Sequence, residues 1–459
     1  MVYTLRMKNL FLLTLACAGS LSAVAAPEVA PSAVTEQSLE TRLTAALDNM
    51  VKKNSEDFYD AAVLVYDATG DAMAFFRMMD KQAAAGHPAA CLWKSNLLGM
   101  QMKNDAAVST VYNAMLGKAS ANKYVPGMVA FAANGVLPTA TEAERKKGMA
   151  VLMDACRAGS AKGRALYLIV SGRIQGGLTQ PEIASELKKK NFYLEEMIAS
   201  MQPDMQSGVV WMEKAAEHGS LVAPFMLCQA LPGEKAELYL KMALDRHYPA
   251  ALGHVGMDIV VRETVNSAAA DPKKVAEGMR MLSIAAMLGN PVAMQMLAYL
   301  NANGQGNNLS KENIVELFRL AHSCGEIDAT AGLGYCKVLG AGCPQDVQGG
   351  LALMEDARAK GAKWVNQAFA SMYFNGDGVK ADMRKAIDAL SEDYLNGSRH
   401  AYAMMAALTA IGNASAKPDP SSARVYLDMA IQSGDRDARM YYDMFLKEGK
   451  WRFMEELTR

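Results

Sequence analysis

The sequence predicts an all-α fold, a right-handed α-solenoid built from helix-turn-helix repeats. Glycines recur at a fixed interval in the second half of the chain, where successive members are 36, 36, 36 and 37 residues apart from Gly289 to Gly434. Between these glycines, apolar residues recur every three or four positions, which is typical of amphipathic helices, and strand patterns are nearly absent. A fixed period of this length indicates about ten stacked helix pairs that bury their apolar faces against one another.

Residues 1–25 are predicted to be a signal peptide and not part of the fold. Arg6 and Lys8 precede an apolar run, and the small residues Ala23 and Ala25 fit cleavage after Ala25. The apolar run is shorter than the roughly 20 residues that a membrane-spanning helix needs. A lipoprotein acylated at Cys17 is the alternative. We therefore expect an exported protein, periplasmic or secreted, without a membrane span.

The rest of the chain is divided by composition and by the phase of the repeat. It comprises a flexible leader rich in proline and small residues (26–36), N-terminal repeats (37–172), an insertion that departs from the period (173–207), C-terminal repeats (208–445) and a charged C-terminal cap (446–459). The insertion is predicted to contain a helix of its own, which starts at the capping pair Thr179 and Glu182.

In the first half of the chain, the turn residues recur at a similar spacing but less regularly. Gly86, Asn122 and Gly159 are 36 and 37 residues apart, and asparagine tolerates the left-handed conformation next best after glycine. The phase then slips, because 60 residues separate Gly159 from Gly219. The predicted structural turn residues are Gly86, Asn122, Gly159, Gly219, Gly289, Gly325, Gly361, Gly376, Gly378, Gly397 and Gly434.

The segment YFNGDGVKADMRKA at 373–386 raises the question of an ion or phosphate site, because Asp377 lies between two glycines. A calcium loop needs oxygen ligands at alternating positions, and Val379 occupies one of them. The Gly-Lys-Ser/Thr of a phosphate loop is missing. The same glycine pair also recurs one period earlier without an acidic residue between its members. We therefore interpret the segment as a backbone turn in which Val379 packs into the core and Asp382 caps the next helix.

The repeated pattern resembles the Sel-one-like repeat (SLR) family, relatives of the tetratricopeptide repeats. The resemblance rests on the aromatic residue, the Gly-x-Gly-Val turn, the aspartate and the Lys-Ala of YFNGDGVKADMRKAIDAL, and on the ending KAAEHG at 214–219. It implies a non-enzymatic scaffold that binds a protein or peptide partner on a concave helical surface. The partner's identity and the oligomeric state are left open.

Catalytic, cofactor and metal-ligating residues are not identified in the sequence. The six histidines lie in separate repeats, and motifs for a nucleophile elbow or a zinc helix are missing. Glu195, Glu196 and Asp356 are interpreted as solvated residues on helix faces. A net charge of −1 without a basic stripe argues against a nucleic-acid partner. The alternative function is that of a small-ligand binder or a hydrolase of the β-lactam or peptidoglycan type, which cysteine-rich SLR relatives suggest.

Cysteine and methionine each leave a question open. Export makes disulfides chemically possible, and Cys336 and Cys343 are the only near pair with a plausible geometry for one. Cys91 and Cys156 lack the partners that the cysteine-rich relatives use to link the helices of a repeat, so we expect the remaining cysteines to be small buried residues. The 33 methionines recur at core spacing, which favours core packing over a soft binding groove.

Overall fold

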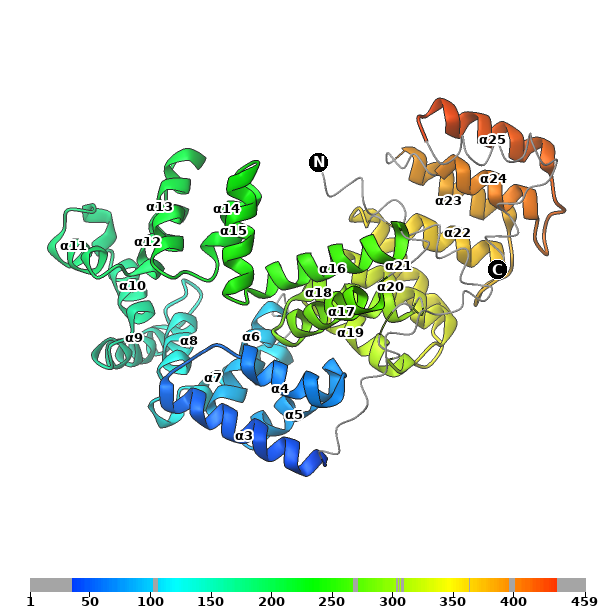
Figure 1. The fold of residues 1–459 in the computed structure, drawn as a ribbon. Helices are drawn as coiled ribbons and strands as arrows, with labels where there is room; N and C mark the ends of the chain where they lie inside the picture. The colour runs from blue at the N-terminus through cyan, green and yellow to red at the C-terminus, as the bar shows by residue number, and fades with distance from the viewer. Residues whose placement is uncertain are drawn as a thin grey trace. The chain divides into compact units, whose positions relative to one another are not determined.

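The computed structural model describes residues 35–101, 106–266, 271–302, 304, 306, 309–362, 364–395 and 401–435. Within these ranges the chain forms helices and no strand, and the pairing of Asn413 with Ala416 is an isolated bridge. The predicted all-α class is therefore confirmed (Figure 1). The predicted signal peptide, Gly397 and the C-terminal cap lie outside the described residues.

The chain divides into two compact units, and residues 29–256 and 280–293 make up the first, here called the N-terminal unit. Its described helices are α3 (Glu36–Lys53), α4 (Tyr59–Thr69), α5 (Ala72–Ala84), α6 (Pro88–Gln101), α7 (Ala106–Ala119), α8 (Val125–Gly135), α9 (Glu142–Arg157), α10 (Ala161–Val170), α11 (Pro181–Lys188), α12 (Phe192–Ser200), α13 (Met205–Glu217), α14 (Ala223–Ala230) and α15 (Glu234–Asp245), with 3-10 turns η1 (Ala121–Lys123) and η2 (Arg173–Gly176). The first described helix, α3, begins at Glu36, the last residue of the predicted leader.

The second unit, here called the C-terminal unit, contains the described residues of 257–279 and 294–435. Its described helices are α19 (Lys311–Ser323), α20 (Ile327–Leu339), α21 (Val347–Ala359), α22 (Val365–Asn375), α23 (Met383–Leu395), α24 (Ala401–Ile411) and α25 (Pro420–Gln432). Three further helices begin in one unit and end in the other: α16 (Pro249–Asn266), α17 (Pro272–Met287) and α18 (Pro291–Ala302).

Within each unit the helices stack in chain order. In the N-terminal unit α8 packs on α9, α12 on α13 and α14 on α15, and in the C-terminal unit α20 packs on α21, α22 on α23 and α24 on α25. Helices two positions apart also touch, as α6 and α8 do, and likewise α20 and α22. Because the contacts join neighbours in the sequence, each unit is a solenoid of stacked helix pairs, as the repeat period predicts.

One residue with a positive φ makes the turn between the two helices of most pairs. The glycines in this position have φ between 83° and 107° and are Gly86, Gly159, Gly219, Gly289, Gly325 and Gly361, and Gly434 has a φ of 83° after the end of α25. The residue after the turn then starts the next helix. Ser160 Oγ accepts the Gly163 N–H at 2.9 Å, and Asn290 Oδ1 accepts the Ala293 N–H at 2.8 Å. These caps satisfy backbone donors that a helix start leaves unpaired.

The prediction for Asn122 is displaced by one residue. Asn122 lies inside the 3-10 turn η1, and its neighbour Lys123 adopts the left-handed conformation with φ of 59°. The chain makes this short turn before it reverses, so Lys123 is the residue directly before Tyr124, the N-cap of α8. Gly86 and Gly159 have the equivalent position in their own repeats. The spacings from Gly86 to Gly159 are therefore 37 and 36.

Residues 173–207 contain two helices, α11 and α12, where one was expected. The turn between them places Lys190 in the left-handed region with φ of 58°, which divides the interval from Gly159 to Gly219 into 31 and 29 residues. A shortened repeat therefore fills most of the segment. The expected capping pair of Thr179 and Glu182 is wrong, since Pro181 sets the φ of the first helical residue and the N-cap is Gln180.

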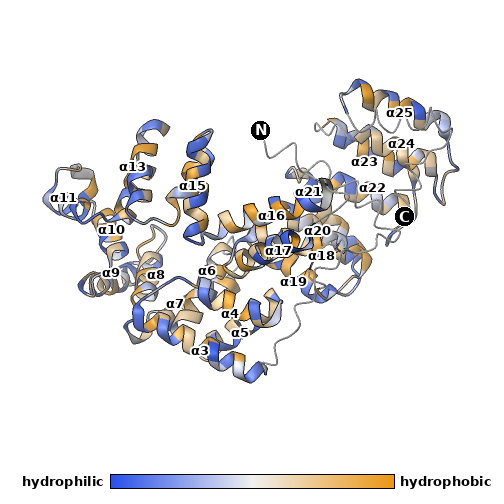
Figure 2. Ribbon diagram, viewed as in Figure 1, coloured by the Kyte–Doolittle hydropathy of each residue, from blue (hydrophilic) through white to orange (hydrophobic). Residues whose placement is uncertain are grey.

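Small residues bring the helices close together. The alanines that follow the turns are all buried, with exposure of at most 1%: Ala90, Ala223, Ala293, Ala329 and Ala401. Gly334 of α20 faces Gly350 of α21 so closely that a Cβ on Gly334 would lie 2.7 Å from the Gly350 carbonyl oxygen. Methionines such as Met79, Met294 and Met404 fill the core between the helices. Figure 2 shows hydrophobic and hydrophilic residues alternating along α13 and α15, as expected of amphipathic helices.

Candidate functional site

The turn between α22 and α23 is built by two glycines. Gly376 and Gly378 have φ of 81° and 68°. A Cβ on Gly378 would lie 2.4 Å from the Val338 carbonyl oxygen, so the turn presses on the backbone of the preceding repeat. Val379 packs against the core of the C-terminal unit and stays partly exposed. A side chain at position 378 would therefore both strain the backbone and force the two repeats apart.

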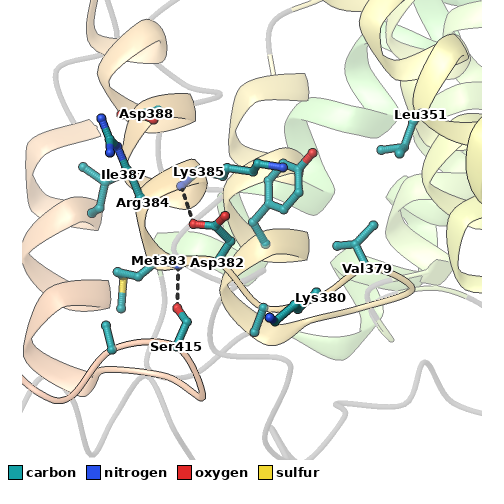
Figure 3. Close-up of a pocket in the computed structure, with 13 residues that line it drawn as sticks. Leu351, Val379, Lys380, Asp382, Met383, Arg384, Lys385, Ile387, Asp388 and Ser415 are labelled. Atoms are coloured by element: carbon teal, nitrogen blue, oxygen red, sulfur yellow. Dashed lines mark hydrogen bonds between the residues drawn. The ribbon is translucent and has the colours of Figure 1, made fainter.

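Asp382 and Ser415 fix the start of α23. Asp382 Oδ1 accepts the Lys385 N–H at 3.1 Å, and Ser415 Oγ accepts the Met383 N–H at 2.8 Å (Figure 3). The Asp382 N–H in turn donates to the Tyr373 carbonyl oxygen at 2.8 Å. Asp382 thus has the capping role that the sequence predicts.

A hollow of about 810 Å³, here called the turn pocket, opens beside this turn. Leu351, Tyr373, Val379 and Ile387 supply its apolar wall, and each of the four is partly exposed. The pocket takes residues from α21, from the turn itself, from α23 and from the loop that holds Ser415 (Figure 3). The segment that the sequence identifies as a structural turn therefore also lines a cavity within the size range of ligand sites.

Three cations surround the turn pocket. Lys380, Arg384 and Lys385 are exposed, and the Lys385 ammonium lies 5.1 Å from the centre of the Tyr373 ring. Neither Lys380 nor Arg384 forms an ion pair with a described residue. Asp388 is the exposed carboxylate in the lining, because Asp382 is occupied with its cap. The rim is therefore positively charged, and charge together with apolar surface is available to a ligand.

A second hollow, of about 490 Å³, lies in the N-terminal unit and has a different chemistry. It is lined by α6, by Tyr112 of α7 and by the turns that precede α16 and α18, and no charged side chain lines it. Burial raises the pKa of Tyr112, and burial together with the Glu196 charge raises the pKa of Tyr248. Both phenols therefore stay neutral at physiological pH. This hollow offers no charge complementarity to a partner.

The interpretation of Glu195 and Glu196 as solvated residues is wrong. Glu195 is 2% exposed, and the His218 Nδ1 lies 2.9 Å from both of its carboxylate oxygens. Glu196 is partly buried and accepts a hydrogen bond from the Ser220 hydroxyl. The reason is that α12 packs against α10, α11 and α13, so it is covered on several sides. Asp356 is exposed as expected and pairs with Lys360 at 2.6 Å.

These buried groups are paired within the protein and are not arranged as a nucleophile with its base. The Ser220 hydroxyl oxygen accepts the Val222 and Ala223 N–H groups at 3.1 and 2.8 Å, so it caps α14 while it donates to Glu196. Burial raises the pKa of Glu196, which the Ser220 hydrogen bond and the Lys162 charge partly offset. The hydrogen bonds of the cluster therefore join α12 to the start of α14.

The pKa of a neighbouring carboxylate, Glu186, is shifted in the opposite direction to that of Glu196. Glu186 is buried and lies 2.9 Å from Arg164, 2.8 Å from Lys189 and 3.0 Å from the Asn191 amide. Burial acts to raise its pKa, but the hydrogen bonds from Lys189, Asn191 and Arg164 outweigh it, and the pKa is lowered. This carboxylate is thus held ionised by its partners.

The Sel1 repeat family model matches residues 199–220, 291–316, 327–361, 368–388 and 399–435, and the stretch 368–388 contains the turn of the turn pocket. The chain carries Sel1 repeats. Its fold is similar to that of a protective antigen of uropathogenic Escherichia coli that displays an SLR fold (14% identity, 93% of this chain and 94% of that chain covered, TM-score 0.41). It is also similar to a Sel1 repeat protein from Oxalobacter formigenes (18% identity, 76% and 93% covered, TM-score 0.32). No curated protein matches the chain.

The cysteines of the Sel1 repeats and of the N-terminal unit are free thiols in the structure. This includes Cys336 and Cys343, the pair for which the sequence left a disulfide open. Burial, followed by the proximity of Cys343, raises the pKa of Cys336 to about 12. Cys91 is fully buried, as expected for a small core residue, whereas Cys156, Cys228 and Cys324 are partly exposed, contrary to that expectation. The raised pKa makes the Cys336 thiol a poor nucleophile.

In the described part of the chain, no group of three or more His, Cys, Asp or Glu residues has a geometry that could hold a metal ion. None of its helices within the described ranges is long and apolar enough to cross a bilayer. Among the described histidines, His322 contacts Thr330 at 2.8 Å and His218 contacts Glu195 at 2.9 Å. The turn pocket is therefore the candidate site that the geometry supports best.

Proposed function

We propose that this protein is an exported, non-enzymatic Sel1 repeat scaffold that binds a protein partner and docks a segment of that partner in the turn pocket. The observation that carries the proposal is a rigid turn that holds exposed cations beside partly exposed apolar side chains. Stacked repeats support such a role because they present side chains from successive helices on one surface. The concave surface expected from the repeats stays a prediction, and the turn pocket is the specific place where we expect contact.

Site-specific crosslinking in the native cell tests this function. A photocrosslinking amino acid replaces Lys380 at the rim of the turn pocket or, as a control, Lys52, which is exposed on α3. We expect one adduct of defined mass from position 380 and no such adduct from position 52. Equal adducts from both positions, or none from position 380, would contradict docking at this pocket.

Export is the second part of the proposal and rests on the signal-like segment 1–25. The mature protein is expected to begin at Ala26, and intact-mass measurement of protein recovered from the periplasm or the medium checks this. Protein that retains Met1, or that carries a lipid on Cys17, would overturn it.

The absence of enzymatic activity is proposed as well, and the β-lactam or peptidoglycan hydrolase is its rival. The buried Ser220 and the partly exposed His218 are engaged in capping and pairing, which leaves neither side chain available to attack a substrate. We expect no turnover of nitrocefin or of peptidoglycan fragments by the purified protein. Turnover that is lost in Ser220→Ala or His218→Gln would establish the rival function.

A further inference from the structure

Three successive turns of the C-terminal unit share one backbone hydrogen bond, although the third turn is one residue longer, and the shared bond allows a comparison at the aspartate and the residues that follow it. The N–H groups of Asp346, Asp382 and Asp419 donate to carbonyl oxygens at the end of the preceding helix, at 2.9, 2.8 and 2.9 Å. Each aspartate then caps the helix that follows it, with Oδ1 accepting N–H groups two or three residues further on. The fold therefore requires the aspartate in all three turns.

Two of the three cations of the turn pocket, Arg384 and Lys385, occur in only one of these turns, whereas Lys380 has a counterpart in Lys417, two residues before Asp419. Arg384 and Lys385 stand two and three residues after Asp382, whereas the equivalent residues are Gln348 and Gly349 in the preceding turn and Ser421 and Ser422 in the following one. Since α21 and α25 begin in the same way without a cation, a helix can start after such a turn without a positive charge at these positions, although Lys385 belongs to the Lys-Ala of the repeat pattern and Arg384 does not.

The position of these cations is also unfavourable for the helix. Arg384 and Lys385 occupy the first turn of α23, where the partial positive charge of the helix dipole disfavours cations and favours carboxylates. Residues that break a local rule without stabilising the fold are expected at functional sites. Arg384 gains no ion pair from a described residue in return, and Lys385 contacts the Tyr373 ring.

From this comparison we infer that the occupant of the turn pocket is an acidic protein segment that carries an apolar residue. The inference rests on the proposed function and names the chemistry of the partner. Carboxylates of the segment would meet Arg384, Lys385 and Lys380 on the rim, and its apolar side chain would lie against Tyr373 and Ile387. A free inorganic anion fits less well, because Asp382 and Ser415 already occupy the Lys385 and Met383 N–H groups at the start of α23.

Binding of short labelled peptides to the full-length mature protein tests the inference. The probe consists of glutamate and glycine with one central leucine, and its controls replace glutamate by lysine or leucine by serine. We expect the acidic leucine peptide to bind about tenfold more tightly than either control, measured by fluorescence anisotropy. Raising the salt from about 0.05 M to about 0.5 M should weaken its binding, because exposed charges are then screened.

Charge-reversal variants test whether the acidic peptide binds at Arg384 and Lys385. Arg384→Glu combined with Lys385→Glu should weaken the acidic peptide about tenfold and make the lysine peptide the better ligand. The matched control is Lys52→Glu with Lys53→Glu, which makes the same change in net charge at two exposed residues of α3 and should leave the preference unchanged.

Two outcomes would overturn the inference. One is equal binding of the acidic and lysine peptides, and the other is a preference that the reversal at 384 and 385 does not change. A cellular partner that crosslinks at position 380 but binds independently of charge would also overturn it, while the proposed scaffold function would stand. Failure to crosslink any partner would instead count against the proposed function.

Discussion

At the scale of single residues, backbone conformation separates positions that look alike in the sequence. Gly361 and Gly378 both have positive φ, but nothing lies within 4 Å of a Cβ added to Gly361, whereas Gly378 presses on the Val338 carbonyl. The glycine pattern identifies both as turn residues. It does not distinguish the one that also holds two repeats together, because the contact is made with a residue 40 positions earlier.

Replacing these glycines by alanine should therefore have unequal effects. Gly361→Ala is expected to cost about 1 kcal/mol of unfolding free energy, since alanine only has to adopt a left-handed conformation. Gly378→Ala should cost about 2–4 kcal/mol, because the two repeats must also separate. Urea denaturation of the two purified variants checks the difference, and equal losses would show that the close approach has no energetic weight.

Because the turn lies at Lys123 and not at Asn122, glycine substitutions at these two positions should change the stability of the protein in opposite directions. Lys123→Gly should be neutral or stabilise the protein by up to about 1 kcal/mol, because glycine removes the cost of a side chain in the left-handed region. Asn122→Gly should destabilise it by about 0.5–1 kcal/mol, because residue 122 lies in a 3-10 turn and needs no such freedom. Thermal melts of both variants decide which residue makes the turn.

At the scale of helices, neighbouring carboxylates around α12 respond to pH in opposite directions. The pKa of Glu196 is raised, so its contribution to stability is present below its unfolded pKa and is lost as the pH rises through the folded value. The pKa of Glu186 is lowered, so its contribution is present above its unfolded pKa and is lost as the pH falls through the folded value.

Amide substitutions should separate these two contributions. Glu196→Gln keeps an acceptor for the Ser220 hydroxyl and should raise the melting temperature at neutral pH, with the gain vanishing in acid. Glu186→Gln should lower the melting temperature at neutral pH and have little effect in acid, because the carboxylate that Arg164 and Lys189 stabilise is then protonated in the parent protein. If both variants changed the melting temperature in the same direction at neutral pH, this explanation would be contradicted.

Charge reversal in the first turn of α23 should stabilise the protein while it weakens binding of the acidic peptide. Arg384→Glu with Lys385→Glu places two carboxylates where the helix dipole favours them, which should stabilise the protein by about 1 kcal/mol. The control pair Lys52→Glu and Lys53→Glu removes cations from the last turn of α3 and should destabilise it by a similar amount. Melting curves measure both. A loss of stability in the 384 and 385 variant would indicate that these cations serve the fold.

At the scale of the whole molecule, the two units are joined through continuous helices. The boundaries at residues 256, 279 and 293 fall inside α16, α17 and α18, whereas independent domains are joined by exposed linkers. Limited proteolysis of the native protein is therefore expected to leave these three helices uncut while it cleaves exposed turns. Early cleavage within residues 249–266 would show that this junction opens as a linker does.

The sequence by itself determined the all-α class, the repeat period, most of the turns and the cap at Asp382. Each of these depends on interactions between residues close together in the chain, namely helical periodicity, left-handed turns and capping hydrogen bonds. Only the tertiary structure decided that Glu195 is buried against His218, that residues 173–207 contain a short repeat, and that the turn at 376–382 borders a pocket. In each of these cases helices or loops distant in the sequence come together, and a local pattern does not specify which side chains then meet.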